Sequence, residues 1–352
     1  DLEGRFLYAN PEWEIMTGNV CNNVIGKTDH ELMGYELGEY YWNMDREVIE
    51  SGLRVEKEET LLVDGKESIM LCIKIPMIEN GCVKGMCGIG TDITKLKRLQ
   101  KNLLEERDKS DKLLLNVLPK AVADELKEKG TTHSENFDDV AVLFSDINDF
   151  TRMSSNLAPE ILISELNDIF TQFDNAIEKN NCERIKTIGD AYMAVCGLPE
   201  PNIDYADHIV DASTKLICAL KSRAKDSDLK WSTTIGIYGG SVVGGVVGIK
   251  KYIYDIFGST VNKAARLQSA TKIYNSNIII SDTIFDHMHH VDKHYIRQLD
   301  LVRVKGEQVP IKIYEVFDCD EEPLKTQKIE TLPIFNQARK LYLQGDFKEA
   351  MV

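Results

Sequence analysis

The sequence predicts an α+β protein in which a helical linker separates two domains of mixed helix and strand. The chain has 352 residues, and this length suits two or three domains of ordinary size. Short strand candidates alternate with helical and turn segments in both halves of the chain. Residues 92–117, between the halves, contain neither glycine nor proline. We expect an N-terminal domain at 1–94, a linker at 95–130, a second domain at 131–320 and a truncated helical tail at 321–352.

Composition excludes several classes of function. The formal net charge of -15 argues against a nucleic-acid or anionic-membrane surface, so a polyanionic substrate must meet a local cation or metal ions. No apolar stretch approaches the length of a membrane span. We expect a cytoplasmic location for this portion. Because the chain begins without methionine and stops within a helical pattern, we interpret it as a piece of a longer protein that could be membrane-attached upstream.

The cysteines predict neither a disulfide framework nor a zinc site. No pair has the CxxC spacing, and most lie inside apolar runs. We interpret them as small, reduced core residues of a cytosolic protein. The eight are Cys21, Cys72, Cys82, Cys87, Cys182, Cys196, Cys218 and Cys319.

The N-terminal domain carries motifs that mark backbone turns. DLEG opens the chain, YANP follows at 8–11, IGKT lies at 25–28 and GTDIT at 90–94. Together these motifs resemble a PAS sensory domain, lacking at most its first strand or N-terminal cap. The signature cysteine of a flavin photosensor is absent, and the PAS ligand stays unknown. The strand candidates of this domain are 5–8, 58–63, 69–75 and 83–89.

The linker has the pattern of a coiled coil. Apolar residues recur on alternating steps of three and four, with two polar interruptions at Glu106 and Ser110. A single amphipathic helix packed on its own domain would show a similar stripe, but we favour a short parallel dimer coil. Leu118-Pro119 breaks this helix, and a second helix is expected at 121–129, ending at Gly130. The seam is Leu96, Leu99, Leu103, Glu106, Ser110, Leu113 and Val117.

An aspartate ends the first strand of the second domain. Residues 139–146, DVAVLFSD, are nearly continuously apolar until Asp146, and 147–151 then turn into a helix. A carboxylate beside a helix N-terminus suits a metal ion and phosphates, because free backbone N–H groups attract anions while the acid holds the cation. The alternative, an N-capping role, fits Asn148 or Asp149 better than Asp146.

A hairpin supplies two further charges. The runs 184–188 and 191–196 flank Gly189-Asp190, a pair that suits a two-residue turn. Lys186 lies inside the first run and Asp190 at the turn; alone, these could be a solvated residue and a turn former. Asp146 and Asp190 at neighbouring strand ends could bracket two Mg²⁺ or Mn²⁺ ions.

Two later stretches complete the set of candidates. Residues 233–248 alternate glycine with β-branched residues, which we interpret as a strand and a helix packed closely. Asn262 and Arg266 stand four apart and share a helix face, where they could hold a ribose and charge developing on a phosphoryl group. An ordinary polar helix face is the alternative. Lys305, in VKG, offers another cation.

Four motifs in order resemble the catalytic core of class III nucleotide cyclases. They are FSDINDFT, RIKTIGDAYMAVCGLP, YDIFGSTVNKAAR and VKG, and the resemblance covers about 138–317. It implies a ferredoxin-like α/β-sandwich that works as a homodimer with sites at the interface, each completed by both subunits. The preceding linker resembles the signalling helix of sensor-linked cyclases.

The resemblance also implies roles for individual residues. Metal ligands are expected at Asp146, Ile147 and Asp190, for two Mg²⁺ or Mn²⁺ ions. Substrate-binding residues are expected at Lys186, Asp255, Phe150 and Thr151, with Lys186 and Asp255 reading the base. Ribose, transition-state and triphosphate contacts are expected from Asn262, Arg266 and Lys305.

The base-reading pair favours ATP. Adenine presents an acceptor at N1 and a donor at N6, which match a lysine donor and an aspartate acceptor, whereas guanine reverses both polarities. We therefore expect an adenylate cyclase, regulated by the PAS domain, in which the ribose 3′-hydroxyl attacks the α-phosphorus to give 3′,5′-cyclic AMP and pyrophosphate. The alternatives are a guanylate cyclase and a catalytically silent PAS and coiled-coil dimerisation module.

Two remaining features are ambiguous. His287, His289, His290 and His294 cluster in HMHHVDKH, and we interpret them as a solvated surface patch rather than a zinc site. In the tail, apolar residues flank Gly345-Asp346 and predict one helix and the start of another. This pattern is similar to a helical repeat of the TPR kind, which would provide protein contacts.

Overall fold

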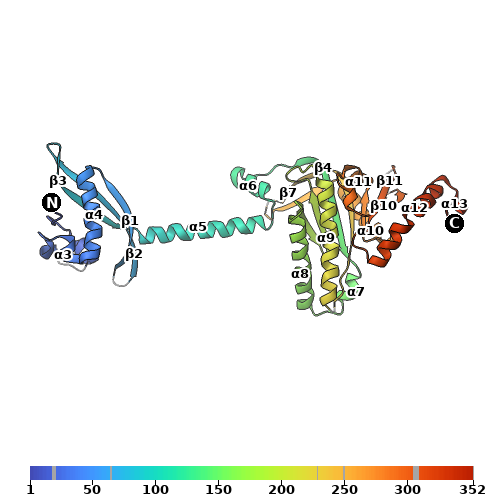
Figure 1. Cartoon of the computed structure of the whole chain (residues 1–352), viewed down its shortest axis with the longest axis horizontal. Helices are drawn as coiled ribbons and strands as arrows, with labels where there is room; N and C mark the ends of the chain where they lie inside the picture. Colours follow the sequence, from blue (N-terminus) through green and yellow to red (C-terminus); the bar gives the residue numbers. More distant parts are fainter. Residues whose placement is uncertain (18–20, 64–65, 228, 249, 304–308, 352) are drawn as a thin grey trace. The chain divides into compact units, whose positions relative to one another are not determined.

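The chain forms two compact units, Asp1–Lys112 and Leu113–Val352, each of which is described by itself (Figure 1). The computed structural model describes residues 1–17, 21–63, 66–227, 229–248, 250–303 and 309–351. In these residues no helix is long and apolar enough to cross a membrane.

The N-terminal unit places helices before a three-stranded antiparallel sheet of order β1-β2-β3. The structure thus confirms three of the four predicted strands, each longer than expected. The strands are β1 (Val55–Val63), β2 (Lys66–Glu79) and β3 (Cys82–Asp92), and the helices are α1 (Pro11–Thr17), α2 (Cys21–Val24), α3 (Asp29–Met33) and α4 (Tyr35–Ser51).

The strand predicted at 5–8 was wrong. This segment makes a single bridge, from Arg5 to Thr28. The backbone N–H of Phe6 donates to the carbonyl of Lys27, and the N–H of Gly26 donates to the carbonyl of Phe6. Because the backbone groups of Phe6 pair with residues 26–27, just before α3, the segment joins neither described sheet in spite of its apolar residues.

Helix α3 packs directly on α4, which in turn covers the sheet. Gly38 of α4 permits this approach, since a Cβ there would lie 2.5 Å from the Cα of His30. Thr28 caps α3 through a capping box with Glu31. Met44 and Val48 of α4 are buried in the core of this unit.

Helix α5 (Thr94–Leu115) leaves the sheet at a fixed point. The Thr94 hydroxyl accepts a hydrogen bond from the N–H of Ile69, and the Thr94 N–H donates to Asp92. None of the residues of α5 is buried. The predicted seam therefore lies open along the helix, although Val117 falls beyond its end. Four leucines of the seam are exposed: Leu96, Leu99, Leu103 and Leu113.

The second unit is built on one mixed sheet of eight strands. Their order is β10-β11-β9-β7-β4-β6-β5, and β8 pairs with β7. Among the described strands, β7 and β9 run parallel and the other pairs run antiparallel. The strands are β4 (Glu135–Ile147), β5 (Glu183–Ile188), β6 (Ala191–Cys196), β7 (Thr233–Val247), β8 (Ile253–Phe257), β9 (Ile278–Ser281), β10 (Ile296–Val302) and β11 (Ile311–Val316).

Helices cover both faces of this sheet, so its strands are buried on two sides. Alternate residues of β4 serve different cores: Leu143 packs with α8 and α9, whereas Val142 packs with α6 and α10. Helices α8 and α9 run side by side on their face (Figure 1). The helices are α6 (Lys120–Lys129), α7 (Phe150–Ser154), α8 (Pro159–Glu178), α9 (Tyr205–Asp226), α10 (Ser259–Tyr274) and α11 (Asp282–His287), with a 3-10 turn at Val291–Lys293.

The glycine-rich stretch 233–248 is almost entirely one strand, β7, where a strand and a helix were expected. The helix that packs closely on it is α10, from later in the chain. A Cβ at Gly236 would lie 2.0 Å from the backbone nitrogen of Gln268, so this position requires glycine. The glycines thus serve the close approach that the sequence indicated, but with a different partner.

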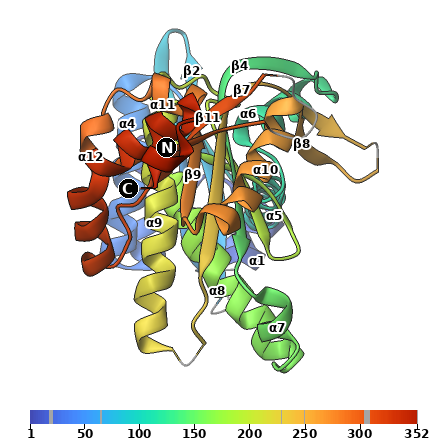
Figure 2. The ribbon, with the colours of Figure 1, turned by 90° about the vertical axis from the view of Figure 1, so that its right-hand side faces the viewer.

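Two elements extend from this core. The ends of β7 and β8 form a hairpin that projects past the sheet (Figure 2) and exposes Val247, Ile253 and Phe257. The tail forms α12 (Glu322–Gln344) and α13 (Phe347–Ala350) around Gly345, as predicted. Gly345 has φ 90, a left-handed conformation that favours glycine after a helix. The likeness of the tail to a TPR repeat stays a prediction.

Candidate functional site

Two aspartates meet at one end of the second sheet. Asp146 is the penultimate residue of β4, and Asp190 lies in the turn between β5 and β6. In the antiparallel pairing of β4 with β6, Ser145 stands opposite Tyr192. This register brings the turn at Asp190 beside the end of β4. We call Asp146 and Asp190 the acid pair.

The acid pair has the electrostatics of a cation site. Burial, and then the neighbouring carboxylate of Asp190, raise the pKa of Asp146 above its usual value. The Nζ of Lys272, on α10, lies 3.8 Å from Asp146 Oδ2 and acts in the opposite direction. The Asp146 side chain is 30% exposed to solvent, so ions can reach it. Two repelling carboxylates with one partly exposed ammonium nearby fit a divalent metal ion.

The residues after Asp146 take three different positions. The side chain of Ile147 is buried in the core with α8 and α9, so only its backbone carbonyl could bind a metal ion. Phe150, at the start of α7, packs on the same core with its ring centroid 6.1 Å from that of Trp231. Thr151 is exposed.

The N-capping alternative is not supported by the structure. Asp149 occupies the N-cap of α7, but its side chain makes no capping hydrogen bond and instead accepts from Arg152. Asn148 donates to Ser232. Neither Asn148 nor Asp149 therefore caps α7 through its side chain. Asp146 is not at the N-cap of α7 either.

Lys186 and Asp255 form a pair across two strands. Lys186, on β5, donates from Nζ to Asp255 Oδ2, on β8, at 2.5 Å. The other carboxylate oxygen of Asp255 accepts the N–H of Ile256 at 2.9 Å, which fixes its orientation. Both side chains are only partly exposed, at 35% and 15%. A donor and an acceptor thus lie next to each other at the edge of the sheet.

Asn262 and Arg266 are both exposed on α10, on one face of the helix. Among the described residues, neither has a hydrogen-bond or ion-pair partner. Lys272 is the residue of α10 that lies next to Asp146. Arg266 precedes Lys272 by six residues, which is about 9 Å along the helix axis and about 120° around it. Within one chain, the structure therefore does not bring these two residues to the acid pair. Lys305 lies outside the described residues.

The histidine cluster differs from its predicted surface patch. His287, His289 and His290 are exposed, but the side chain of His294 is 6% exposed and lies between Asp318 and Asp211. The pKa of His294 is raised: burial lowers it, but the hydrogen bond to Asp318 and the nearby acids outweigh burial. A pattern of histidines alone carried no signal for these partners, which come from distant elements.

One group in the described residues has the composition of a metal site. Ligand atoms of Asp204, Asp207 and His289 lie within 4.8 Å of one another. Both oxygens of Asp207 accept backbone N–H groups, from His289 and His290, and His289 pairs with Asp204. These bonds fasten the loop after α11 to the start of α9.

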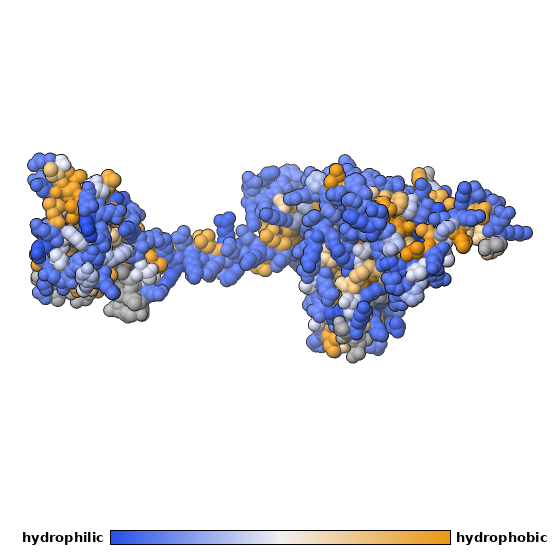
Figure 3. Space-filling view, viewed as in Figure 1, coloured by the Kyte–Doolittle hydropathy of each residue, from blue (hydrophilic) through white to orange (hydrophobic). Residues whose placement is uncertain are grey.

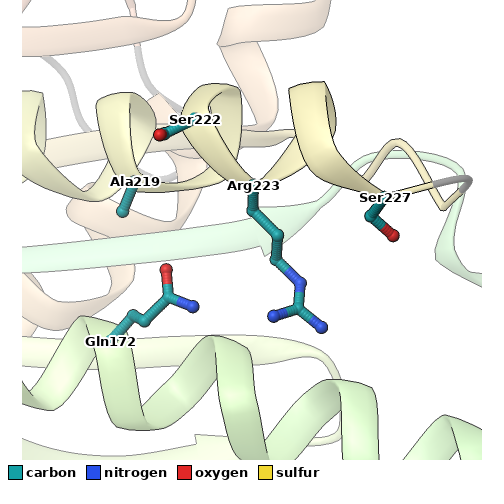
Figure 4. Close-up of a pocket in the computed structure, with 5 residues that line it drawn as sticks. All are labelled: Gln172, Ala219, Ser222, Arg223 and Ser227. Atoms are coloured by element: carbon teal, nitrogen blue, oxygen red, sulfur yellow. The ribbon is translucent and has the colours of Figure 1, made fainter.

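A hollow of about 620 Å³ lies between α8 and α9, lined by Gln172, Ala219, Ser222, Arg223 and Ser227 (Figure 4). Arg223 in this hollow is already paired with Glu165 at 2.7 Å. None of its lining residues is among the predicted site residues.

Comparison with known proteins agrees with this geometry. The family model described as the adenylate and guanylate cyclase catalytic domain matches residues 132–317, and a PAS fold model matches residues 1–98. The receptor-type guanylate cyclase gcy-5 of Caenorhabditis elegans is 34% identical over 258 residues, 72% of this chain and 23% of that protein. An adenylate cyclase of Mycobacterium bovis is 33% identical over 209 residues, 58% of this chain and 45% of that protein.

The fold has a counterpart among solved structures. A bacterial light-regulated adenylyl cyclase superposes with a TM-score of 0.55 at 21% identity, over 67% of this chain and 70% of that one. This chain spans less than half the length of the two curated relatives above. The matched segments place a PAS domain before a catalytic domain, and the chain belongs to the adenylate and guanylate cyclase catalytic domain family, class III.

Proposed function

We propose that this protein is an adenylate cyclase that converts ATP to 3′,5′-cyclic AMP and pyrophosphate. The observation that carries the choice of base is the contact between Lys186 and Asp255. N1 and N6 are adjacent on the edge of adenine, so the base needs a donor and an acceptor side by side. The Lys186 ammonium would donate a hydrogen bond to N1, and a carboxylate oxygen of Asp255 would accept one from the N6 amino group. Guanine, with the reverse pattern, leaves both groups mismatched.

The acid pair would hold the metal ions, two Mg²⁺ or Mn²⁺, together with the Ile147 carbonyl. Such ions, when bound there, would lower the pKa of the ribose 3′-hydroxyl and neutralise charge on the triphosphate. The chain itself supplies two negative charges at the end of a sheet, and a partly exposed path for the triphosphate. Phe150 and Thr151 lie at the start of the helix beside this point and stay proposed substrate contacts.

The exposed position of Asn262 and Arg266 supports a homodimer. Each chain presents the acid pair at one place and these two side chains on a helix face that points elsewhere. A second copy could bring Asn262 to the ribose and Arg266 to the charge that develops on the α-phosphoryl group. We propose that neither chain alone holds a complete site. Lys305 keeps its proposed contact to the triphosphate.

The open leucine seam of α5 supports regulation through the linker. A parallel coil would bury Leu96, Leu99 and Leu103 and couple the PAS domain to the way two catalytic domains meet. The domain limits 1–94, 95–130, 131–320 and 321–352 stay part of this proposal, as do the cytoplasmic location, the coil and protein contacts of the tail. The PAS ligand stays unassigned.

The test is to measure product from ATP and from GTP, with Mn²⁺, at several protein concentrations. We expect cyclic AMP, with a specific activity that rises with concentration because two chains form each site. The double variant Lys186→Glu/Asp255→Cys should lose most activity on ATP and gain on GTP. Asp255→Asn is the matched variant, because the amide keeps the shape of the side chain while it removes the charge and adds a donor. It therefore tests the acceptor role of Asp255 by itself.

Each result bears on a separate part of the proposal. Cyclic GMP from the wild-type protein would replace the base assignment and leave the cyclase chemistry in place. No product from a preparation shown to be dimeric would favour the silent sensory module. An activity independent of protein concentration, measured across the dissociation range, would contradict the shared site.

A further inference from the structure

Two cysteines from distant parts of the catalytic unit touch each other. Cys218 lies on α9, and Cys319 follows the end of β11, 101 residues later. Their sulfur atoms are 2.7 Å apart. Nonbonded heavy atoms ordinarily stay about 3.5 Å apart or more, so the two thiols lie inside contact distance without being joined. The sequence predicted reduced core cysteines, but Cys218 is exposed and Cys319 is half-buried.

The surroundings favour reaction at this pair. The Cys319 sulfur donates to the carbonyl of Thr214 at 3.2 Å, which holds it over α9. Lys221, one turn after Cys218, donates to the carbonyl of Cys319, and its charge acts to lower the pKa of the Cys319 thiol. A nearby cation stabilises a thiolate. Burial and the neighbouring sulfur raise the pKa of Cys319, so the exposed Cys218 is the thiol that reacts first.

We infer that Cys218 and Cys319 form a reversible disulfide that staples the end of β11 to α9 when the protein meets a low-molecular-weight disulfide. The Cys218 thiolate attacks one sulfur of the small disulfide and expels one small thiolate. Cys319 then loses its proton and attacks the Cys218 sulfur, expelling the second small thiolate. The protein loses two hydrogens and two thiols become one disulfide, while the oxidant is reduced to two thiols.

The staple would act where the tail meets the catalytic domain. Asp318 accepts hydrogen bonds from His294 and from the N–H of Tyr295. Asp320 accepts from Asn277 and from Lys328 of α12. Cys319 lies between these two aspartates, so a bond to Cys218 would fix this junction to α9. Oxidation would thereby stabilise the attachment of α12 without touching the acid pair.

The test uses the full chain, incubated with glutathione disulfide and then with a thiol reductant. We expect the intact mass to fall by two hydrogens and a peptide map to show one cross-link, between Cys218 and Cys319. The melting temperature of the catalytic unit should rise by about 5 °C or more on oxidation and return on reduction, because a long loop is closed. The base-reading and metal residues are intact in both states, so a failure here would leave the proposed cyclase function unaffected.

Variants make the inference falsifiable. Cys218→Ser should abolish the cross-link and the shift in melting temperature; its side chain is exposed, so the fold should be kept. The matched control is Cys82→Ser/Cys87→Ser, which removes two exposed cysteines of the N-terminal unit and should change neither result. A stable glutathione adduct on Cys218 without the cross-link would overturn the inference. So would a cross-link that persists in Cys218→Ser, or one that joins two chains.

Discussion

Two groups of charged side chains, one in each unit, contain the same residue types but differ in their access to water. In the N-terminal unit, Asp29, Asp45 and Lys74 are 8%, 7% and 8% exposed. In the catalytic unit, the acid pair stands near Lys272, whose side chain is 65% exposed. The first group lies between helices and sheet, and the second lies at strand ends.

Burial decides what each group can do. Lys74 pairs with Asp45 and donates to the carbonyl of Tyr41 at 3.2 Å, whereas no ion pair of Asp29 is found in the described part of the chain. Burial, and then the charge of Asp45, raise the pKa of Asp29 to about 6. The buried group thus takes up a proton, whereas the acid pair is open to solvent at the place where we propose that metal ions bind. Two aspartates and a lysine are thus structural in the N-terminal unit, and the same two residue types form the proposed metal site in the catalytic unit.

The largest expected effect separates activity from stability at the acid pair. Asp146→Asn should lower cyclase activity on the order of 100-fold or more, because one metal ligand loses its charge. The free energy of unfolding of the catalytic unit should stay the same or rise, since repulsion from Asp190 is relieved. Product formation and urea unfolding measure the two quantities. Asp149→Asn is the control and should keep its activity, because Asp149 lies three residues on and pairs with Arg152 at the surface.

The buried lysine should show the opposite pattern. Lys74→Met removes the only cation paired with Asp45 among the described residues and should destabilise the N-terminal unit by about 3 to 5 kcal/mol. Lys272→Met is the matched comparison, because an exposed pair contributes about 1 kcal/mol or less. Urea titration of each unit's transition measures both. Equal losses of stability in the two variants would contradict the contrast between the units.

Asp29 predicts a dependence of stability on pH. Its folded pKa of about 6 exceeds the ordinary 3.8, so between these values the folded state binds more protons and its stability falls as pH rises. Above pH 6 the cost is complete, at about 3 kcal/mol. Asp29→Asn should therefore stabilise the N-terminal unit at pH 8 relative to wild type.

The same variant supplies its own control through pH. At pH 4 the wild-type carboxyl is already protonated when folded, so the advantage of Asp29→Asn should shrink toward zero. Urea unfolding of the wild type and the variant at pH 4, 6 and 8 gives the comparison. If the two proteins differed in free energy of unfolding by the same amount at all three pH values, the pKa of Asp29 would not differ between the folded and unfolded states.

Surface hydropathy separates the PAS sheet from the linker helix. Apolar side chains gather over the region of β3 in the N-terminal unit, whereas α5 is mostly hydrophilic in the same view (Figure 3). The leucines of α5 are nevertheless exposed, as a narrow seam requires. A narrow seam among charged residues suits a contact that must change, and it is consistent with the proposed role of the linker.

Much of the fold follows from local patterns in the sequence. The hairpin around Gly189-Asp190, the helix that ends at Gly130 and the tail turn at Gly345 were all predicted, because each depends on residues a few positions apart. The order of the catalytic motifs likewise predicted the family. The strand at 5–8 was predicted wrongly because its apolar residues say nothing about whether a neighbouring strand exists.

The site divides in the same way. Asp146, Asp190, Lys186 and Asp255 could be chosen from the sequence, since each stands in a short motif whose residue types suit its chemistry. Lys272 could not, because an exposed helical lysine carries no mark of what lies opposite. Nor could the burial of His294, whose partners Asp211 and Asp318 belong to other elements.

What the sequence determined by itself is therefore the set of chemical groups and the local elements that carry them. Only the tertiary structure decided which of those groups meet and how much water reaches them. It joined Lys186 to Asp255 across β5 and β8, brought Cys218 to Cys319, and buried Asp29 while leaving the acid pair open. Distance and exposure set the strength of every electrostatic interaction, and both are properties of the packed chain rather than of its order of residues.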